Sequence, residues 1–383
     1  MILLPLLLGC PKPDDSGDSA EPAACDESAP GTICTWAGQA QAGFNGEGLD
    51  RRDSWLYFPL DVEFSEFGPP AIVDWNNHRI RVVTDDQTLT TVMGTTFVGD
   101  GPSDLSDRTA PGAIGTTVNL NHPTDVIYLP DGRLLSSSWH THKLRIEDLD
   151  TLLTYVRCGS TPGFAGDNGE PAATALFNQP KGAVYDERDG ITYIVDMRNE
   201  RVRALSDDDT ITTIAGNGEK GYSGDDVAAR ETALNFPQGS NPRPGGAIAQ
   251  DGDLLYIADT ENHRIRTIDV VTGMITTVVG TGEAGYTGDG GPAAAAQINY
   301  PLDIEVEGGV LYIADTDNHV IRAVDLATGL ISTIAGSGEI GDAGDGGSPL
   351  DAQLFSPSGV ELDLEGNLYI ADFGNHRIRR VTP

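Results

Sequence analysis

The sequence Tyr256-Ile257-Ala258-Asp259, followed two residues later by Asn262-His263-Arg264-Ile265-Arg266, recurs along the chain. Close copies of the first run begin at Tyr312 and Tyr369, and Tyr193 begins a variant. Copies of the second run, of varying fidelity, begin at Asn77, Thr141, Asn199, Asn262, Asn318 and Asn375. Recurrence at a regular interval predicts a repeat architecture in which each unit is one supersecondary structure.

Two further landmarks follow the same interval. The first landmark is a run of the Ile-Thr-Thr-Ile-Ala type that ends in a glycine. The second is a proline that opens the next strand; in the last three units it lies 21 residues after that glycine. The prolines are Pro59, Pro123, Pro180, Pro237, Pro301 and Pro357, and Cys158 takes the place of one glycine. The chain therefore contains six units of about 58 residues. Each unit has four short strand-like runs bounded by Gly and Asp turns, as in a propeller blade.

These motifs resemble the NHL-repeat family over residues 33–383. The resemblance implies an all-β fold, a six-bladed β-propeller of four-stranded blades. The expected blade units are residues 38–92, 93–156, 157–214, 215–278, 279–334 and 335–383. The last unit stops after its third strand, whereas residues 33–37 have a fourth-strand sequence. We therefore expect residues 33–37 to complete blade six and close the ring, which removes an open sheet edge.

The composition disfavours several classes of protein. The 383 residues include 58 acidic and 24 basic side chains, a net charge of −34, so nucleic acid is not an expected partner because its phosphates would be repelled. A hydrophobic fraction of 39% is too high for a disordered chain. We expect a monomer rich in turns, since the sequence holds 47 Gly and 23 Pro.

The N-terminus resembles the end of a bacterial lipoprotein signal segment. An apolar stretch, residues 1–9, precedes Cys10, the residue that such proteins lipidate; a chance apolar N-terminus is the alternative. Residues 11–32 are predicted to form an acidic tether that does not fold alone. The expected location is the cell envelope, reached by export, with membrane contact through the lipid only. In a Gram-negative host, Pro11 after Cys10 resembles a signal for the outer membrane.

The four cysteines fit this interpretation. If Cys10 carries lipid, Cys25 and Cys34 are close enough in sequence to form a disulfide, which export makes plausible. Cys158 then has no partner. The cysteines do not have the spacing of a zinc site.

The repeated Asp-x-x-Asn-His-Arg segment is interpreted as structural. His, Asp and Arg together can perform acid–base chemistry, but a motif present in nearly every blade is not a single active site. We expect its Asp to cap a turn and its Arg to lie at the blade surface. Function is expected where the units differ.

The differences gather on one expected face, formed by the loops that join strand four to strand one and strand two to strand three. Blade two has an insertion within residues 95–121, and blade four has one at residues 240–244. In blade two, residues 136–140 also break the strand-two motif. Candidate ligand contacts on this face are Trp55, Trp75, Trp139 and His140, because exposed aromatic rings anchor recognition. For the tryptophans, packing between blades is the alternative.

A second candidate site lies at the channel mouth on the same face. Strand one begins there, and three blades carry Asp61, Asp125 or Asp303 where other blades have Gly. Converging carboxylates repel one another unless a cation or a proton lies between them. The sequence therefore suggests a site for Ca²⁺ or another divalent cation, with His122 as a further ligand; turn capping by the three Asp is the alternative.

Two classes of function remain open. The favoured one is a non-catalytic binding scaffold at the cell envelope, with an envelope protein, a glycan or a small ligand as partner. The alternative is a metal-dependent enzyme, because related six-bladed propellers include lyases and lactonase-like hydrolases with metal at the channel. The sequence contains no G-x-S-x-G elbow and no HExxH motif, and no complete catalytic set matches, so catalysis is the less favoured interpretation.

Overall fold

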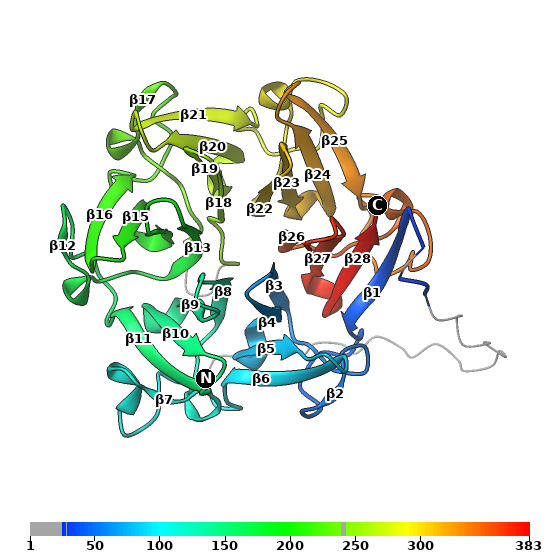
Figure 1. The fold of residues 1–383 in the computed structure, drawn as a ribbon. Helices are drawn as coiled ribbons and strands as arrows, with labels where there is room; N and C mark the ends of the chain where they lie inside the picture. Colours follow the sequence, from blue (N-terminus) through cyan, green and yellow to red (C-terminus); the bar gives the residue numbers. More distant parts are fainter. Residues whose placement is uncertain (1–24, 28, 239–242) are drawn as a thin grey trace, which may run out of the picture.

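The computed structural model describes residues 25–27, 29–238 and 243–383. In these residues, six antiparallel sheets surround one axis, which confirms the six-bladed propeller (Figure 1). The expected lipidation site, Cys10, and most of the tether lie outside the described residues. Among the described residues, none of the helices has the length and apolar character that a membrane crossing requires.

Each blade has four main strands, numbered outward from the axis. The first strands are β3 (Pro59–Ser65), β8 (Pro123–Tyr128), β13 (Pro180–Asp186), β18 (Ile248–Asp251), β22 (Pro301–Glu307) and β26 (Gly359–Leu362). The second strands are β4 (Gly68–Asp74), β9 (Leu134–Ser138), β14 (Ile191–Asp196), β19 (Leu254–Asp259), β23 (Val310–Asp315) and β27 (Leu368–Asp372). The third strands are β5 (Arg79–Val83), β10 (Lys143–Asp148), β15 (Arg201–Ser206), β20 (Arg264–Asp269), β24 (Val320–Asp325) and β28 (Arg377–Thr382). The fourth strands are β6 (Thr88–Gly94), β11 (Leu153–Gly159), β16 (Thr210–Ala215), β21 (Met274–Val279), β25 (Leu330–Ala335) and β1 (Thr32–Gly38).

Short elements complete the blades. Four sheets gain a two-residue fifth strand from the loop before strand one: β2 (Leu49–Asp50), β7 (Ala113–Ile114), β12 (Glu170–Pro171) and β17 (Val227–Ala228). A 3-10 turn joins the second and third strands of each blade: η1 (Trp75–Asn77), η4 (Trp139–Thr141), η6 (Met197–Asn199), η8 (Thr260–Asn262), η10 (Thr316–Asn318) and η12 (Phe373–Asn375). The remaining turns lie between blades: η2 (Ser106–Arg108), η3 (Gly115–Thr117), η5 (Ala172–Thr174), η7 (Ala229–Glu231), η9 (Ala293–Ala295) and η11 (Pro349–Asp351).

Three details differ from the expected strands. Blades one to four have five strands rather than four. The histidine of each basic run is not part of strand three; it has a positive φ and ends the preceding 3-10 turn, as at His263 with φ 50°. In blades four and six, strand one begins after its proline rather than at it, at Ile248 and Gly359.

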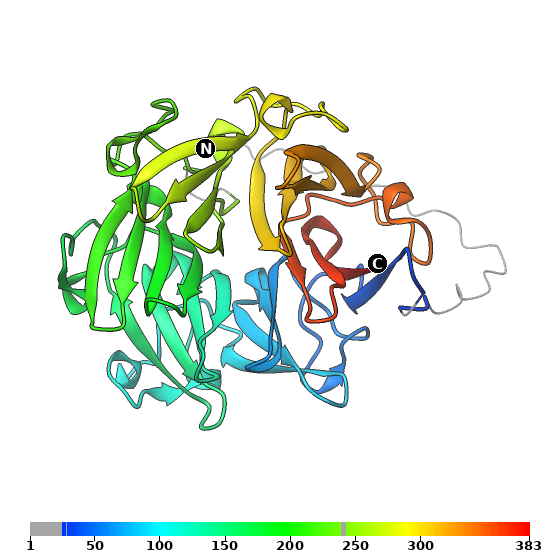
Figure 2. The ribbon, with the colours of Figure 1, turned by 45° about the horizontal axis from the view of Figure 1, so that its top comes forward.

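The ring closes as the sequence predicts. β1 pairs antiparallel with β28, from Thr32 opposite Thr382 to Gly38 opposite Arg377, so the first and last described strands lie side by side in blade six (Figures 1 and 2). A disulfide joins Cys25 to Cys34 in β1, and Cys158 is buried and free.

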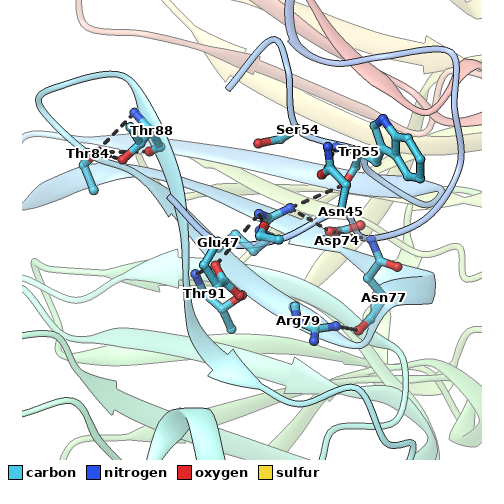
Figure 3. A network of polar contacts seen from close by, with 12 residues as sticks. Asn45, Glu47, Ser54, Trp55, Asp74, Asn77, Arg79, Thr84, Thr88 and Thr91 are labelled. Atoms are coloured by element: carbon cyan, nitrogen blue, oxygen red, sulfur yellow. Dashed lines mark hydrogen bonds and ion pairs between the residues drawn. The ribbon is translucent and has the colours of Figure 1, made fainter. Parts of the chain in front are cut away.

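Five of the six blades contain a buried polar cluster built from the repeated motif, and blade two departs from it. In blade one, Asp74 accepts hydrogen bonds from the backbone N–H of Tyr57 at 2.9 Å and from Asn77 Nδ2 at 2.8 Å, and it pairs with Arg81 at 3.5 Å (Figure 3). Asn77 also donates to the carbonyl of Gly43 in the preceding loop. The motif therefore ties loop, turn and strand together, and the structural interpretation is confirmed. The Arg that directly follows the His is buried in blade one, at Arg79, but half-buried at Arg201, Arg264 and Arg377. The second arginine of the run, Arg81 in blade one, is fully buried.

The histidines join neighbouring blades. The Nδ1 atoms of His78, His142, His263, His319 and His376 each accept a backbone N–H from the next blade at 3.0–3.2 Å. Glu200 replaces the histidine of blade three and accepts the N–H of Phe236 at 2.9 Å. The acceptor role requires a neutral ring, and burial lowers the pKa of His78 and of His142 to about 4.

Candidate functional site

Side chains from four blades close the axis at the end where strand one begins. Trp75, Trp139, Met197 and Phe373 occupy the same position in their blades, the first residue of the 3-10 turn, and share one hydrophobic cluster. Trp75 lies 6.3 Å from Trp139 and 5.8 Å from Phe373, between ring centroids. Equivalent residues of different blades meet only near the axis, so these four side chains form an axial cap.

The expected exposure of two candidate ligand contacts is therefore wrong. Trp75 is 6% exposed and Trp139 is fully buried, because at this position the blades converge and large side chains fill the shared space. Trp55 is half-buried in the loop before β3, where its backbone N–H donates to Asn45. His140 is half-buried and stacks on Trp139 at 4.2 Å. Ligand binding by these residues stays a prediction.

Asp61, Asp125 and Asp303 do converge, directly below the axial cap. All three are buried, at 7–8% exposed, and burial together with the charge of Asp125 raises the pKa of Asp61 well above its usual value. Asp125 also accepts the N–H of Ala183 at 2.6 Å, and Asp303 accepts that of Val360 at 2.9 Å. The sequence placed these residues at an open channel mouth; they lie instead at a closed end.

A lysine that sequence reasoning missed lies among these carboxylates. Lys181 of β13 is 1% exposed, and its Nζ is 3.3 Å from Asp303 Oδ1. Burial alone would lower the pKa of Lys181, but Asp303, Asp125 and Asp61 outweigh that effect and raise it. The ammonium therefore occupies a place that the sequence assigned to a metal ion. A divalent cation at these aspartates stays a prediction.

His122 does not join the aspartates. Its ring lies on the other side of the axial cap, 4.6 Å from Trp75 and 4.4 Å from His78, and it hydrogen-bonds to Asn121 and Asn76. In the described part of the chain, no group of three or more His, Cys, Asp or Glu side chains has a geometry that could hold a metal ion.

A cavity of about 230 Å³ extends from the aspartates along the axis. The side chains become more exposed in the direction of the strands, from buried Asp61 through half-buried Glu63 to exposed Glu187 just beyond β13. The cavity therefore opens on the face opposite the axial cap, past Tyr185, Glu187 and Gln250.

The wall of this cavity has two chemically different halves. At the position facing the axis, the adjacent blades five, six and one carry Glu305, Glu361 and Glu63, which we call the acidic wall. Blades two, three and four carry Ile127, Val184 and Ala249 at the same position, the apolar wall. All six residues line the cavity.

The acidic wall holds protons more tightly than ordinary carboxyls. Burial and neighbouring carboxylates raise the pKa of Glu63 and Glu361 well above the usual value, and burial and Asp303 raise the pKa of Glu305 to about 8. Burial raises the pKa of Asp303 to about 7 even though Lys181 opposes the shift. Among the described residues, no lysine or arginine forms an ion pair with a glutamate of the acidic wall.

We expect this wall to make stability fall as pH rises above about 6.5. Between the unfolded pKa and the raised folded pKa, the folded state binds more protons than the unfolded state, so the free energy of unfolding decreases with pH. The histidines act with opposite sign, but only below their unfolded pKa of about 6.5. Chemical denaturation from pH 6.5 to 9 measures the effect.

The Glu305→Gln variant should lose part of that slope, at most about 2 kcal/mol, because about 1.5 pH units separate pH 6.5 from the folded pKa of about 8. Glu307→Gln, on the same strand but exposed, is the control and should leave the slope unchanged. A parent protein with constant stability from pH 6.5 to 9 contradicts the prediction.

The blade-two insertion has a structural role. Blade two carries Ser138 where five blades have the buried Asp of the motif, yet Arg145 is still fully buried. Asp107 in the insertion, 2% exposed, pairs with Arg145, and Asp100 pairs with it from the other side at 2.9 Å. The insertion therefore supplies the buried carboxylate that the second strand supplies in the other blades.

The described part of the blade-four insertion also contacts the rest of the chain. Arg243 pairs with Asp317 at 2.6 Å and lies over the ring of Tyr300 at 4.7 Å. Residues 240–242 lie outside the described residues. The two insertions therefore do not by themselves mark a recognition surface.

Comparisons with known proteins agree with the fold. No family model matches the chain. Human NHL repeat-containing protein 2 is 34% identical over 291 residues, which cover 69% of this chain and 38% of that protein. SUPPRESSOR OF QUENCHING 1 of Arabidopsis thaliana is 28% identical over 274 residues, 69% of this chain and 24% of that protein. The chain thus spans well under half the length of these relatives.

Among solved structures, an auxiliary nutrient binding protein of Bacteroides ovatus superposes with a TM-score of 0.63 at 16% identity, covering 92% of this chain and 76% of that one. A Bacteroides thetaiotaomicron protein of unknown function gives a TM-score of 0.62 at 18% identity, covering 91% and 74%. At these identities the likeness shows the fold alone.

Proposed function

Since the chain is a six-bladed β-propeller built from NHL repeats, we propose that it is a non-catalytic binding module of the cell envelope that takes a small organic amine in its axial cavity. One observation carries the proposal: the acidic wall faces the apolar wall across a cavity open at one end. Uniform repeats would give a uniform wall, so the division reflects differences between the blades.

The two walls fit the two parts of an alkylamine. The ammonium group of such a ligand pairs with carboxylates of Glu305, Glu361 and Glu63, which have no cation of their own among the described residues. Its hydrocarbon part lies against the apolar wall, where burial is favourable. A cavity of about 230 Å³ suits only a small molecule.

Binding is expected to strengthen as pH rises from 6 to 9. A protonated glutamic acid does not attract an ammonium ion, and the pKa of Glu305 is about 8. In the same range an alkylamine stays charged, since ordinary amine groups titrate near pH 10.

Calorimetry with n-butylamine, n-butanol and butyrate tests the proposal. The amine should bind, more tightly at pH 8.5 than at pH 6, and the isosteric alcohol and acid should not. Glu305→Gln should weaken amine binding on the order of tenfold, whereas Glu307→Gln should not. Equal heats from all three compounds, or equal binding by both variants, would exclude the axial amine site.

The envelope location rests on the sequence and on one feature of the fold. The Cys25–Cys34 disulfide fits an oxidising compartment, and Cys10 would carry the lipid. Structurally similar proteins of Bacteroides bear the name auxiliary nutrient binding protein, which supports a binding role. Expression in a Gram-negative host should place the protein in the membrane fraction, and Cys10→Ser should release it; a parent protein in the soluble fraction contradicts anchoring.

A further inference from the structure

A groove of about 410 Å³ lies between blades two and three, at the end of the molecule where the axial cavity opens. Its floor is apolar, formed by Leu135, Ile146 and Leu205, each about 2% exposed. Its sides carry two half-buried tyrosines, Tyr155 from β11 and Tyr185 from β13. The amine site does not use Tyr155.

Tyr155 is a departure from the repeat that sequence reasoning did not notice. It pairs with Ile146 in the sheet. At the same position of the fourth strand the other blades have Thr, Ser or Cys, namely Thr90, Thr212, Thr276, Ser332 and Cys34. A large aromatic ring at this position exists in blade two alone.

The polar groups of the groove are held in place and balance one another in charge. Arg133 donates to the hydroxyl of Tyr155 at 2.9 Å and pairs with Asp131 at 2.6 Å. The hydroxyl of Tyr185 donates to Asp207 at 2.8 Å. Arg157 lines the groove and pairs with Asp209.

Local neutrality is unusual in a chain with a net charge of −34. Because the groove has no excess negative charge, it does not attract an organic cation as the axial cavity does. It does not favour an anion either, because its guanidinium groups already pair with carboxylates. What remains is a hollow with aromatic sides and fixed hydrogen-bonding groups above an apolar floor.

We propose that this groove binds an uncharged carbohydrate. A sugar ring has apolar C–H faces that pack on tyrosine rings, and hydroxyl groups that bond both to carboxylates and to guanidinium groups. The groove offers these partners together and needs no charge on the ligand. This site goes beyond the proposed amine site and does not depend on it, although Tyr185 borders both hollows.

The test uses the full chain and the Tyr155→Thr variant, which installs the residue found in blades one, three and four. Binding of cellotriose, maltotriose and chitotriose to each protein is measured by saturation-transfer NMR and by calorimetry. At least one trisaccharide should bind, and Tyr155→Thr should weaken it on the order of tenfold, since truncation of a buried aromatic contact costs more than about 1 kcal/mol. Tyr286→Thr, which removes a ring outside the groove that is 43% exposed, is the control.

Each outcome decides. Trisaccharide binding lost with Tyr155 and kept with Tyr286 supports the site, whatever the result with n-butylamine. No binding of any of the three, or equal loss in both variants, overturns it. If a neutral peptide such as Ala-Ser-Thr-Ala binds the groove and the sugars do not, the carbohydrate assignment is also overturned. Binding of n-butylamine to the Tyr155→Thr variant tests the axial site separately.

Discussion

Replacement of Asp107 by Ala is expected to destabilise the protein by about 3–5 kcal/mol, the usual cost of removing one partner from a buried ion pair. Arg145 is fully buried and pairs with no carboxylate of its own sheet, because Ser138 has replaced the Asp of the motif. Asp100 remains but is 43% exposed, so it compensates only in part. The midpoint of guanidinium unfolding measures the loss.

A second substitution should reverse this effect. Ser138→Asp places a carboxylate where Asp74, Asp196, Asp259, Asp315 and Asp372 pair with their arginines. In the Asp107→Ala background it should recover most of the lost stability, whereas in the parent it adds a buried negative charge and should destabilise. Asp104→Ala, exposed in the same insertion, should change stability by less than about 0.5 kcal/mol. Equal effects of Asp107→Ala and Asp104→Ala would contradict the structural role.

The fold was predictable because the repeat leaves little freedom. Six copies of one motif with constant spacing specify both the blade and the number of blades, and the fourth-strand sequence around Thr35 lacks a partner unless it pairs with Arg379. The disulfide followed from the short distance in sequence between Cys25 and Cys34. These inferences depend on local pattern and on chain connectivity, both of which are present in a single sequence.

The candidate site was harder to predict because it depends on how equivalent positions meet across the ring. The position of a residue within the repeat does not by itself show that the side chain after strand two points to the axis. For this reason Trp75 and Trp139 were expected on the surface. Lys181 was missed for a similar reason. Strand pairing in blade three is irregular between Pro180 and Ala183, and alternation along a strand does not give side-chain direction at such a point.

The acidic wall shows what the sequence did contain. The sequence analysis singled out an Asp or Gly near the start of strand one, and the acidic-wall residues Glu63, Glu305 and Glu361 each lie two residues after it. In a β-strand, residues two apart have side chains on the same face. Comparison of this position across the six blades would have found the division into acidic and apolar halves. Asp107 gave no such signal, because its partner is 38 residues away and the connection passes through an insertion without repeats.

Replacement of Lys181 by Met should destabilise the protein strongly at pH 8 and much less at pH 5. Without the ammonium, Asp61, Asp125 and Asp303 are buried carboxyls with raised pKa, and their ionisation at pH 8 has no compensating charge. We expect a loss of about 3–5 kcal/mol at pH 8. At pH 5 the carboxyls take up protons, so most of that loss disappears, because the folded state then binds more protons than the unfolded state.

Two measurements separate this effect from a simple packing defect. Lys220→Met removes a half-exposed lysine 3.8 Å from Glu200 and should cost at most about 1 kcal/mol at either pH, whereas a packing defect at position 181 would cost the same at pH 5 and pH 8. Calcium then tests the cation prediction itself. If the three aspartates form a cation site that the lysine occupies, Ca²⁺ should raise the melting temperature of the Lys181→Met variant and leave the parent unchanged, since a ligand stabilises only the folded state that binds it. A Lys181→Met protein that is indifferent to both pH and Ca²⁺ would mean that the aspartates are held by their backbone hydrogen bonds alone.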